Sequence, residues 1–328
     1  MKIGLLHTTD AAGPPEDPVL GQLEEALHAR GDETFRAVVP ESIDPLIMQL
    51  RAEAPDLVFN MAEAFAGKSA LESNVAALLN LLGLRYTGSS PSGLMVAGDK
   101  ALTKKILSFH KIKTPQFATV FRGALDSSVG DLAFPVIVKP PQEDASLGIT
   151  SKSVVHDIKE LFEAMHDLQK EFKSPVLVEQ YVEGREFYVG VLGNSSATAL
   201  PVIELDFSKF PTDKPRIASY AAKWGEDGEG TGDEFAGTES IFPTGVEPEL
   251  LERMQRVAVE AFDALRLRDY GRIDLRVTPE GEIFVIEVNP NCYLERSGEF
   301  ARAAEKSGLA YPALVERIVE LATARYSR

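Results

Sequence analysis

Two short runs of residues, joined by four turn residues, constrain the fold of this chain more than any other feature. The runs cover residues 271–277 and 282–291, and the sequence between them is Thr278-Pro279-Glu280-Gly281. Successive side chains of a strand point to opposite faces, so the first run would separate aliphatic from charged residues. The pattern therefore predicts a hairpin with one buried face and one polar face.

The four turn residues also predict the register of this hairpin. Val277 would lie opposite Glu282, and Arg272 opposite Glu287. A slip of one residue would place Glu287 and Asn289 among the core aliphatics, which costs free energy for polar groups without partners. The residues then expected on the apolar face of the second strand are Phe284, Ile286 and Val288.

The polar face of the predicted hairpin carries oxygen ligands beside a guanidinium. The ligands are Asp274, Glu287 and Asn289, and the guanidinium is that of Arg272. Mg²⁺ prefers such ligands and usually completes its shell with water and substrate phosphate. The hairpin thus indicates a magnesium–nucleotide site. The alternative is a solvated polar face with a surface Arg–Glu pair, which contributes little to stability.

Charge and cysteine content exclude several classes of protein. The 328 residues carry 34 basic and 50 acidic side chains, a net charge of −16, which argues against a general nucleic-acid or anionic-membrane partner. The single cysteine, Cys292, excludes an intrachain disulfide and a thiolate zinc site and fits a reducing compartment. The apolar run at residues 1–7 is too short for a signal peptide, and no run approaches the ~18 apolar residues of a membrane helix. A cytoplasmic location is expected.

Strand and helix patterns divide the chain into three predicted parts. Residues 1–95 alternate between the two patterns, which is typical of a parallel sheet covered by helices. Residues 96–183 and 184–328 are predicted to form two α+β units. The acidic, glycine-rich stretch 225–237 lies in the last part and is expected to be a mobile loop.

The chain lacks the two commonest nucleotide-binding motifs. It contains no Walker A sequence, and no dinucleotide fingerprint follows the first predicted strand. Lys139 instead ends an apolar strand, before a loop with Ser146 and Gly148 whose backbone N–H groups would suit the same phosphate. A lysine that emerges into solvent at a strand end is equally compatible with the pattern.

A second stretch has the features of an adenosine site. Residues 176–187 form a predicted strand, a turn at Gly184 and another strand, and such a turn exposes backbone groups that can read an adenine edge. Glu186 would accept hydrogen bonds from ribose hydroxyls. An ordinary strand–turn–strand explains the same residues, just as Lys100 and Lys223 are compatible with solvated lysines.

The order of these elements along the chain is more specific than any one of them. The elements are Asp99-Lys100, the strand 134–140 with Lys139, the strand from Val176 to Glu179, Gly184-Arg185-Glu186, Lys223, Arg272-x-Asp274 and Glu287-x-Asn289-Pro290. Together they resemble the ATP-grasp superfamily, and most of all its D-alanine:D-alanine ligase family, from the first strand to the last helix. The resemblance implies an α/β protein with the ATP-grasp fold, in which a Rossmann-like N-terminal domain precedes two α+β subdomains that enclose ATP.

The resemblance also implies an activity and a role for each matching residue. The activity would be that of an ATP-dependent carboxylate:amine ligase, which forms an amide through an acyl phosphate. Arg272, Lys223 and Ser146 would be catalytic, with Arg272 stabilising negative charge on the transferring phosphoryl group. The residues implied to bind two Mg²⁺ ions, or Mn²⁺ in their place, are Asp274, Glu287 and Asn289. The residues implied to bind ATP are Lys100, Lys139, Glu179, Gln180, Tyr181, Val182, Glu186 and Lys223.

The residues that would select the substrates depart from the family pattern. The family's glycine-rich first loop with its substrate-binding Glu is replaced, and Glu16 is the residue that could take this role. Ala145 stands where the family has a serine, and Trp224 where it has a tyrosine. The loop after the metal ligands lacks the family's serine-rich turn, and Arg296 and Ser297 are expected as new carboxylate contacts. D-alanine is therefore only one candidate substrate.

Three functions are open on the sequence alone. The favoured one is a ligase for small amino-acid-like molecules. The others are an ATP-binding regulatory or scaffold protein without turnover, and a phosphotransferase. Family ligases are commonly dimers, so the resemblance also implies a homodimer. Cys292 is expected to pack near the site rather than to act as a nucleophile, because nothing visible would lower its pKa.

Overall fold

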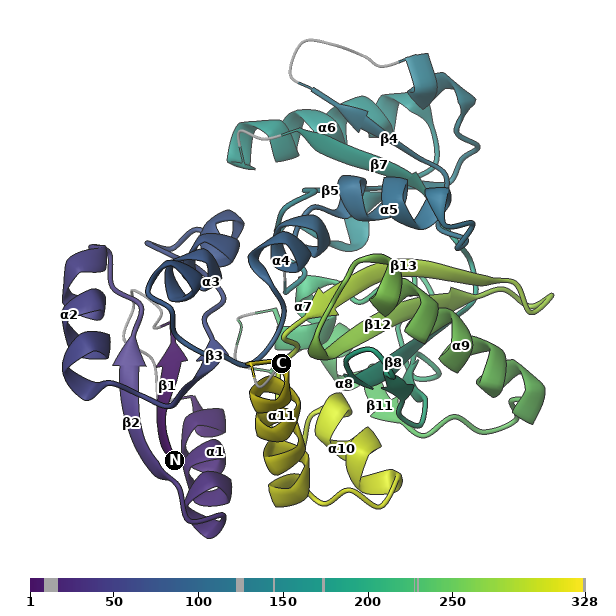
Figure 1. Cartoon of the computed structure of the whole chain (residues 1–328). Helices are drawn as coiled ribbons and strands as arrows, with labels where there is room; N and C mark the ends of the chain where they lie inside the picture. Colours follow the sequence, from purple (N-terminus) through teal and green to yellow (C-terminus); the bar gives the residue numbers. More distant parts are fainter. Residues whose placement is uncertain are drawn as a thin grey trace.

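The computed structural model of the chain describes residues 1–8, 17–121, 127–143, 145–172, 175–226, 228 and 230–326. Its described strands form three sheets, and the first is a parallel sheet in the order β2-β1-β3 with helices around it (Figure 1). This confirms the parallel sheet predicted for the start of the chain. The elements of this part are β1 (Lys2–His7), α1 (Pro18–Ala29), β2 (Glu33–Val38), α2 (Ile43–Glu53), β3 (Leu57–Met61), α3 (Glu72–Leu81) and α4 (Pro91–Ala97).

The second sheet is antiparallel and has a core of its own. Its four strands run in the order β4-β7-β5-β6. Helix α6 presents Leu161, Met165 and Leu168 to it, a spacing that places all three on one face of a helix. Figure 1 shows this unit at the top, apart from the N-terminal sheet. The elements are β4 (Phe117–Val120), β5 (Val136–Lys139), β6 (Val154–Val155), α6 (Ile158–Phe172) and β7 (Val176–Gln180), preceded by α5 (Lys100–Phe109).

The third sheet is the largest and carries the hairpin. Its strands run in the order β11-β10-β8-β12-β13, and β9 pairs with β8. Apolar residues of α9 cover one face, while α10 and α11 pack on the other. The elements are β8 (Arg185–Gly193), β9 (Thr198–Ala199), β10 (Ile203–Asp206), α7 (Tyr220–Trp224), α8 (Asp233–Ala236), β11 (Glu239–Ile241), α9 (Pro248–Ala264), β12 (Asp269–Val277), β13 (Ile283–Pro290), α10 (Glu299–Lys306) and α11 (Tyr311–Tyr326). Residues 225–237 were expected to form a mobile loop, but α8 lies within the described part of this stretch.

The hairpin forms as predicted, but its register differs from the prediction. Val277 pairs with Ile283 and Arg272 with Asn289, not with Glu282 and Glu287. A bulge follows Asp274, leaving Ile286 as an extra residue on β13. The bulge changes which side chains face the core, since the buried aliphatics of β13 are Ile283, Val285 and Val288. The expectation that Phe284 and Ile286 join the apolar face was therefore wrong, and that for Val288 was right.

A buried ionic junction joins the first sheet to the third. The carboxylate of Asp269, which is 0% exposed, accepts a hydrogen bond from the backbone N–H of Gly88 at 2.7 Å and pairs with Arg325 of α11 at 2.7 Å. Gly88 has a φ of +87°, and a Cβ there would lie 2.2 Å from Oδ1 of Asn291, so only glycine fits.

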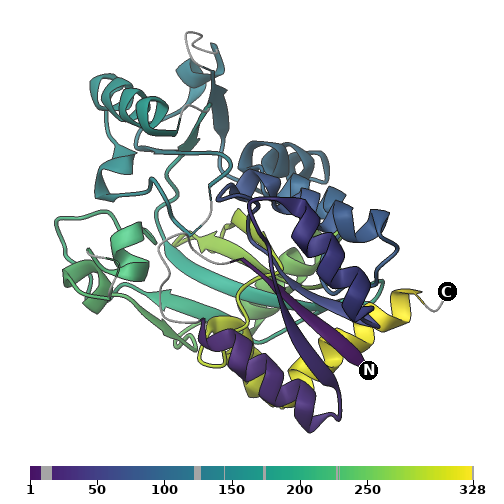
Figure 2. The same cartoon turned by 90° about the vertical axis from the view of Figure 1, so that its left-hand side faces the viewer.

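Helices from the two ends of the chain lie side by side at this junction. Figure 2 shows the purple α1 next to the yellow α11, and one apolar cluster contains residues of both. The first and third sheets thus share a core. The boundaries predicted after residues 95 and 183 stay predictions. No helix in the described ranges is long and apolar enough to cross a membrane.

Candidate functional site

A pocket between the second and third sheets collects most of the residues singled out in the sequence. Its walls come from β5 and β7 on one side and from β8, β12 and β13 on the other, with the segment 217–223 between them. The predicted residues that line it are Lys139, Ser146, Glu179, Gln180, Tyr181, Val182, Glu186, Lys223, Asp274 and Glu287. Residues from four separate stretches of sequence therefore meet at one site.

A buried cluster of two lysines and one glutamate forms one wall. Glu179, 2% exposed, pairs with Nζ of Lys104 at 2.7 Å through Oε2 and with Lys139 through Oε1. Lys104 also donates to Oγ1 of Thr114 at 2.9 Å. Burial would raise the pKa of Glu179, but the two lysines lower it below its ordinary value. The carboxylate is thus ionised, and it lies between two lysine side chains beside the pocket.

Lys104 was not among the residues predicted for the site. It lies on α5, and its side chain is 1% exposed. Burial lowers the pKa of its ammonium, and Glu179 opposes this shift. The sequence signal is a lysine four residues after Lys100 on one helix, because residues i and i+4 lie on the same face.

Lys100 connects the two sides of the pocket. Its Nζ lies 2.9 Å from Oε1 of Glu287 on β13 and donates to the backbone carbonyl of Glu143 at 2.5 Å. Its backbone N–H donates to the carbonyl of Pro141 at 2.9 Å. The first residue of α5 thus joins a carboxylate of the third sheet to the loop that follows β5.

Two carboxylates of the hairpin face each other on the pocket side. Asp274 pairs with Glu287 across the strands, and Arg272 contacts Asp274 through Nε at 2.8 Å and Nη2 at 3.0 Å. Burial raises the pKa of Asp274 to about 6, although Arg272 opposes the shift. Burial would also raise the pKa of Glu287, but the surrounding lysines, above all Lys100, hold it well below its ordinary value.

The donor set of the hairpin fits a hard divalent cation. Asn289 lies next to the two carboxylates, and its Nδ2 is buried without a hydrogen-bond partner. Across the described ranges, no three His, Cys, Asp or Glu side chains converge as a metal site, so the set consists of two carboxylates and one amide. This is the kind of partial oxygen cage that leaves positions for water and phosphate on Mg²⁺.

Arg276 holds the side chain of Glu186. The strand pattern predicts Arg276 on the polar face of the hairpin, but no role was predicted for it. Arg276 donates to Oε2 of Glu186 from Nε at 3.0 Å and Nη2 at 2.8 Å, and both side chains are buried. It also donates to the carbonyls of Val182 and Gly184, at 3.5 and 3.3 Å. Arg276 therefore fixes the turn between β7 and β8. The charged face of β12 continues from Asp274 to Arg276, and this alternation is the signal that could have identified it.

The two positions that depart from the family in the loop after β5 and in α7 contact each other. Nε1 of Trp224 donates to the backbone carbonyl of Ala145 at 3.0 Å. Next to it, Oγ of Ser146 donates to the carbonyl of Ala218 at 2.7 Å. Ala145 and Ser146 have φ values of +54° and +62°, which cost ~1–2 kcal/mol per non-glycine residue. An indole-to-backbone bond thus holds a strained loop against α7.

The structure does not bring the other expected substrate residues to the pocket. The guanidinium of Arg296 lies 2.6 Å from Oε2 of Glu25 on α1, and its backbone N–H donates to Gln22. The hydroxyl of Ser297 donates to the carboxylate of Glu295. Arg296 is therefore held by α1, and Ser297 by a neighbour in its own loop. Glu16 lies outside the described residues.

Cys292 is a packing residue, as expected. It is 7% exposed and belongs to the apolar cluster shared by the first and third sheets. Burial raises the pKa of its thiol to about 12, so the thiolate nucleophile is absent near neutral pH.

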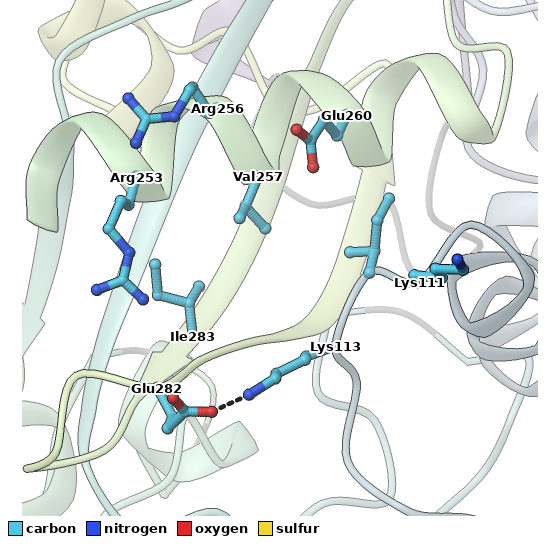
Figure 3. A pocket seen from close by; sticks show the side chains of 9 residues that line it. Lys111, Lys113, Arg253, Arg256, Val257, Glu260, Glu282 and Ile283 are labelled. Carbon is cyan, nitrogen blue, oxygen red and sulfur yellow. Dashed lines mark hydrogen bonds and ion pairs between the residues drawn. The ribbon is translucent and has the colours of Figure 1, made fainter.

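A separate hollow lies on the outer side of α9, away from these residues. Lys111, Lys113, Arg253 and Arg256 line it together with Glu260 and Glu282 (Figure 3). Its charged side chains are exposed, and Lys113 pairs with Glu282. Exposed pairs of this kind stabilise a fold only weakly. None of the residues that line the hollow lines the pocket described above, so we treat the hollow as a separate, solvated surface.

Comparisons with known proteins show which family this chain is similar to. Residues 105–320 match the family model described as D-ala D-ala ligase C-terminus. An uncharacterized protein, y4sG, of Sinorhizobium fredii (strain NBRC 101917 / NGR234) is 31% identical over 320 residues, which cover 94% of this chain and 88% of that protein. The D-alanine–D-alanine ligase of Desulforudis audaxviator (strain MP104C) is 31% identical over 304 residues, 92% of this chain and 91% of that ligase.

Solved structures show the same fold. The D-alanine–D-alanine ligase of Bacillus anthracis, complexed with ATP, matches with a TM-score of 0.75 at 22% identity, over 99% of this chain and 98% of that chain. A second structure of the Bacillus anthracis ligase matches with a TM-score of 0.76 at 24% identity. At these identities the likeness concerns the fold, and it confirms the predicted ATP-grasp architecture. With the family model matched over most of its length, the chain belongs to the D-alanine–D-alanine ligase family of the ATP-grasp superfamily.

Proposed function

We propose that the protein is an ATP-dependent ligase that joins a carboxylate to an amine, using ATP to activate the carboxylate as an acyl phosphate. The observation that carries the proposal is that Asp274 and Glu287 face each other in the same pocket as Lys139 and Lys223. Lysines suit the phosphates of a nucleotide, and paired carboxylates suit the metal that accompanies them. D-alanine is one candidate substrate, because the residues that would select it differ from the family pattern.

The reaction consists of two balanced steps. In the first, an oxygen of the donor carboxylate attacks the γ-phosphorus of ATP, and the bond to the β–γ bridging oxygen breaks, so that ADP leaves with that electron pair. In the second, the acceptor amine attacks the acyl carbon, and phosphate leaves with the electrons of the C–O bond. Loss of one amine proton completes the amide.

Residues of this chain stabilise the charges that develop in both steps. Lys100, Lys139 and Lys223 would hold the phosphates, and Ser146 would support the same loop. Arg272, between the pocket and α10, would stabilise the transferring phosphoryl group and then the oxyanion at the acyl carbon. Preorganised charge of this kind typically supplies most of the rate enhancement of an enzyme.

The base and ribose of ATP would bind at the other end of the pocket. Gln180, Tyr181 and Val182 supply the backbone groups for adenine there, next to the ionised Glu179. Glu186 would accept from the ribose hydroxyls through the oxygen that Tyr188 now contacts at 3.1 Å. The chain thus offers a distinct group for each part of the nucleotide.

Asp274, Glu287 and Asn289 would hold magnesium. When bound, the metal neutralises charge on the phosphate oxygens. Arg272 and Lys100 now balance the two carboxylates, so metal binding would release both cations toward the phosphates.

Phosphate release from ATP over a panel of D- and L-amino acids and hydroxy acids tests the proposal. Activity with at least one pair, and an amide product by mass spectrometry, are expected. Glu287→Gln should reduce kcat by ~10²–10³-fold, the usual cost of one preorganised charge in an active site. Glu282→Gln, which removes an exposed carboxylate at the start of the same strand segment, is the matched control and should change little.

Two outcomes would contradict the ligase function. Thermal stabilisation by ATP without phosphate release over the whole panel would indicate a nucleotide-binding regulatory or scaffold protein. A phosphorylated product that accumulates in place of an amide would indicate a phosphotransferase.

A further inference from the structure

We infer that Tyr188 is a positioning residue for both ends of the nucleotide site. Its ring would hold the guanidinium of Arg272 for phosphoryl transfer, and its hydroxyl would hold Glu186 for the ribose. This inference rests on the proposed ligase function. It gives a role to a buried tyrosine for which the sequence indicated none.

The strand positions place Tyr188 in the middle of the polar face of the third sheet. Tyr188 lies two residues after Glu186 on β8, so both side chains point to the same face. On the neighbouring strand β12, the residue paired with Tyr188 is Asp274. Arg272 comes two residues earlier on β12 and shares that face. Tyr188 therefore lies between the residue proposed to act at the ribose and the residue proposed to act at the γ-phosphate.

The ring of Tyr188 supports the guanidinium of Arg272. The central carbon of the guanidinium lies over the ring, 4.5 Å from its centre. No other arginine or lysine in the described ranges lies as close over an aromatic ring. The guanidinium also contacts Asp274 at 2.8 and 3.0 Å, but magnesium would draw on the same carboxylate oxygens. A hard cation does not compete for the ring, so the stack would keep the guanidinium oriented when the metal is bound.

The hydroxyl of Tyr188 holds one oxygen of Glu186. It donates to Oε1 at 3.1 Å, and each of the two side chains is 3% exposed. Oε2 accepts two bonds from Arg276. Burial raises the pKa of the Tyr188 hydroxyl well above its ordinary value, and Glu186 adds to the shift, so the hydroxyl stays protonated near neutral pH. With both oxygens held, the remaining acceptor direction of Oε1 would meet the ribose in a fixed orientation.

Two substitutions of Tyr188 separate the two contacts. Tyr188→Phe keeps the ring and removes the hydroxyl, so it should raise Kd and KM for ATP about threefold and leave kcat within about twofold. Tyr188→Leu also removes the ring, so it should lower kcat about tenfold further, the value of a buried cation–π contact. Calorimetric titration with ATP and Mg²⁺ gives Kd. Phosphate release with the most active pair of the substrate panel gives kcat and KM.

An ATP analogue shows whether the hydroxyl acts through the ribose contact. In 2′,3′-dideoxy-ATP both ribose hydroxyls are missing, so Glu186 has nothing to accept from. The wild type should bind this analogue more weakly than ATP, and Tyr188→Phe should add no further loss. A general distortion of the pocket would weaken the binding of both nucleotides alike.

Tyr86 provides the matched control. It is fully buried, accepts a bond from Arg268 at 3.2 Å and has that guanidinium 5.7 Å over its ring. It lies at the junction of the first and third sheets, away from the pocket. Tyr86→Phe and Tyr86→Leu should lower Tm as the Tyr188 variants do, but they should leave Kd and kcat within about twofold. All kinetics are measured well below the Tm of the least stable variant.

The outcomes separate the inference from the function on which it rests. No phosphate release from the wild type with any acid of the panel would overturn the ligase function, and the Kd values would still test the hydroxyl. Unchanged or tighter ATP binding in Tyr188→Phe would overturn the inference, since tighter binding would mean that the hydroxyl competes with the ribose. An equal loss with the dideoxy analogue, equal kcat values for Tyr188→Phe and Tyr188→Leu, or the same kinetic losses in the Tyr86 pair would overturn it as well.

Discussion

Replacing Arg276 should destabilise the protein far more than replacing an arginine that makes an equally short ion pair at the surface. In Arg276→Met, the buried carboxylate of Glu186 keeps only the hydroxyl of Tyr188, at 3.1 Å. The backbone carbonyls of Val182 and Gly184 lose a donor as well. Breaking a buried pair by removing one partner costs about 3–5 kcal/mol, because a charge is left without compensation.

A double-mutant cycle isolates the pair. Glu186→Gln should cost about 2 kcal/mol, because the guanidinium of Arg276 retains its carbonyl acceptors. The double variant should cost about 4 kcal/mol rather than the sum of about 6, since no buried charge remains, which gives a coupling of about 2 kcal/mol. Arg296→Met is the control: Arg296 contacts Glu25 at 2.6 Å, but the two side chains are 47% and 70% exposed, and a loss of about 1 kcal/mol is expected.

Thermal unfolding followed by circular dichroism measures the cycle. Arg276→Met should lower Tm by about 6–15 °C, at about 2–3 °C per kcal/mol for a protein of this size, and Arg296→Met by about 2–3 °C. Equal losses in the two arginine variants, or additive losses in the cycle, would refute the reasoning, because both results would mean that burial adds nothing to the energy of the pair.

Three further predictions concern the site. Because burial raises the pKa of Asp274 to about 6, lowering the pH from 7 to 5 protonates it and should weaken Mg²⁺ activation of phosphate release about tenfold; an unchanged Mg²⁺ requirement would contradict this. Trp224→Phe removes the donor to the carbonyl of Ala145 and should lower kcat/KM about fivefold, the value of one hydrogen bond, with Tm within about 2 °C; an unchanged kcat/KM would count against the contact. Cys292 should resist a thiol reagent at pH 8 in the native protein and react after denaturation, so rapid labelling of the native thiol would contradict its burial.

The sequence predicts the two strands of the hairpin, but it does not predict which side chains of the second strand face the core. The two strands and their polar face follow from the alternation in residues 271–277. On the second strand, residues 283–286 are all apolar, so alternation does not say which of them face the core. The bulge at Ile286 settles this: it puts Ile283, Val285 and Val288 on the side that packs against α9, and it places Glu287 directly opposite Asp274. The proposed ligands Asp274 and Glu287 therefore lie on one face of the hairpin, although the predicted register was wrong.

The sequence did not predict which charged residues of the site form ion pairs with each other. Each charged residue of the pocket was visible along the chain, but the pairs Lys104–Glu179 and Arg276–Glu186 join residues 75 and 90 positions apart. Arg296 shows the converse. Its place after the predicted metal ligands indicated a substrate contact, yet Glu25 of α1, 271 residues earlier, is its partner. Long-range packing decides such contacts, and no local pattern encodes it.

The attachment of the second sheet has a mechanical consequence. The chain enters this sheet at β4 and leaves it at β7, and these strands are neighbours, joined where Gln180 N–H donates to the carbonyl of Gln116 at 2.8 Å. Two adjacent crossings attach the sheet along one edge, so we expect the unit to rotate about that edge rather than slide. Tyr181 follows Gln180 at this edge and is expected to move less than the loop that carries Ser146. A nucleotide in the pocket would then keep its contacts at the base, while its phosphate end would be exposed to solvent in each cycle.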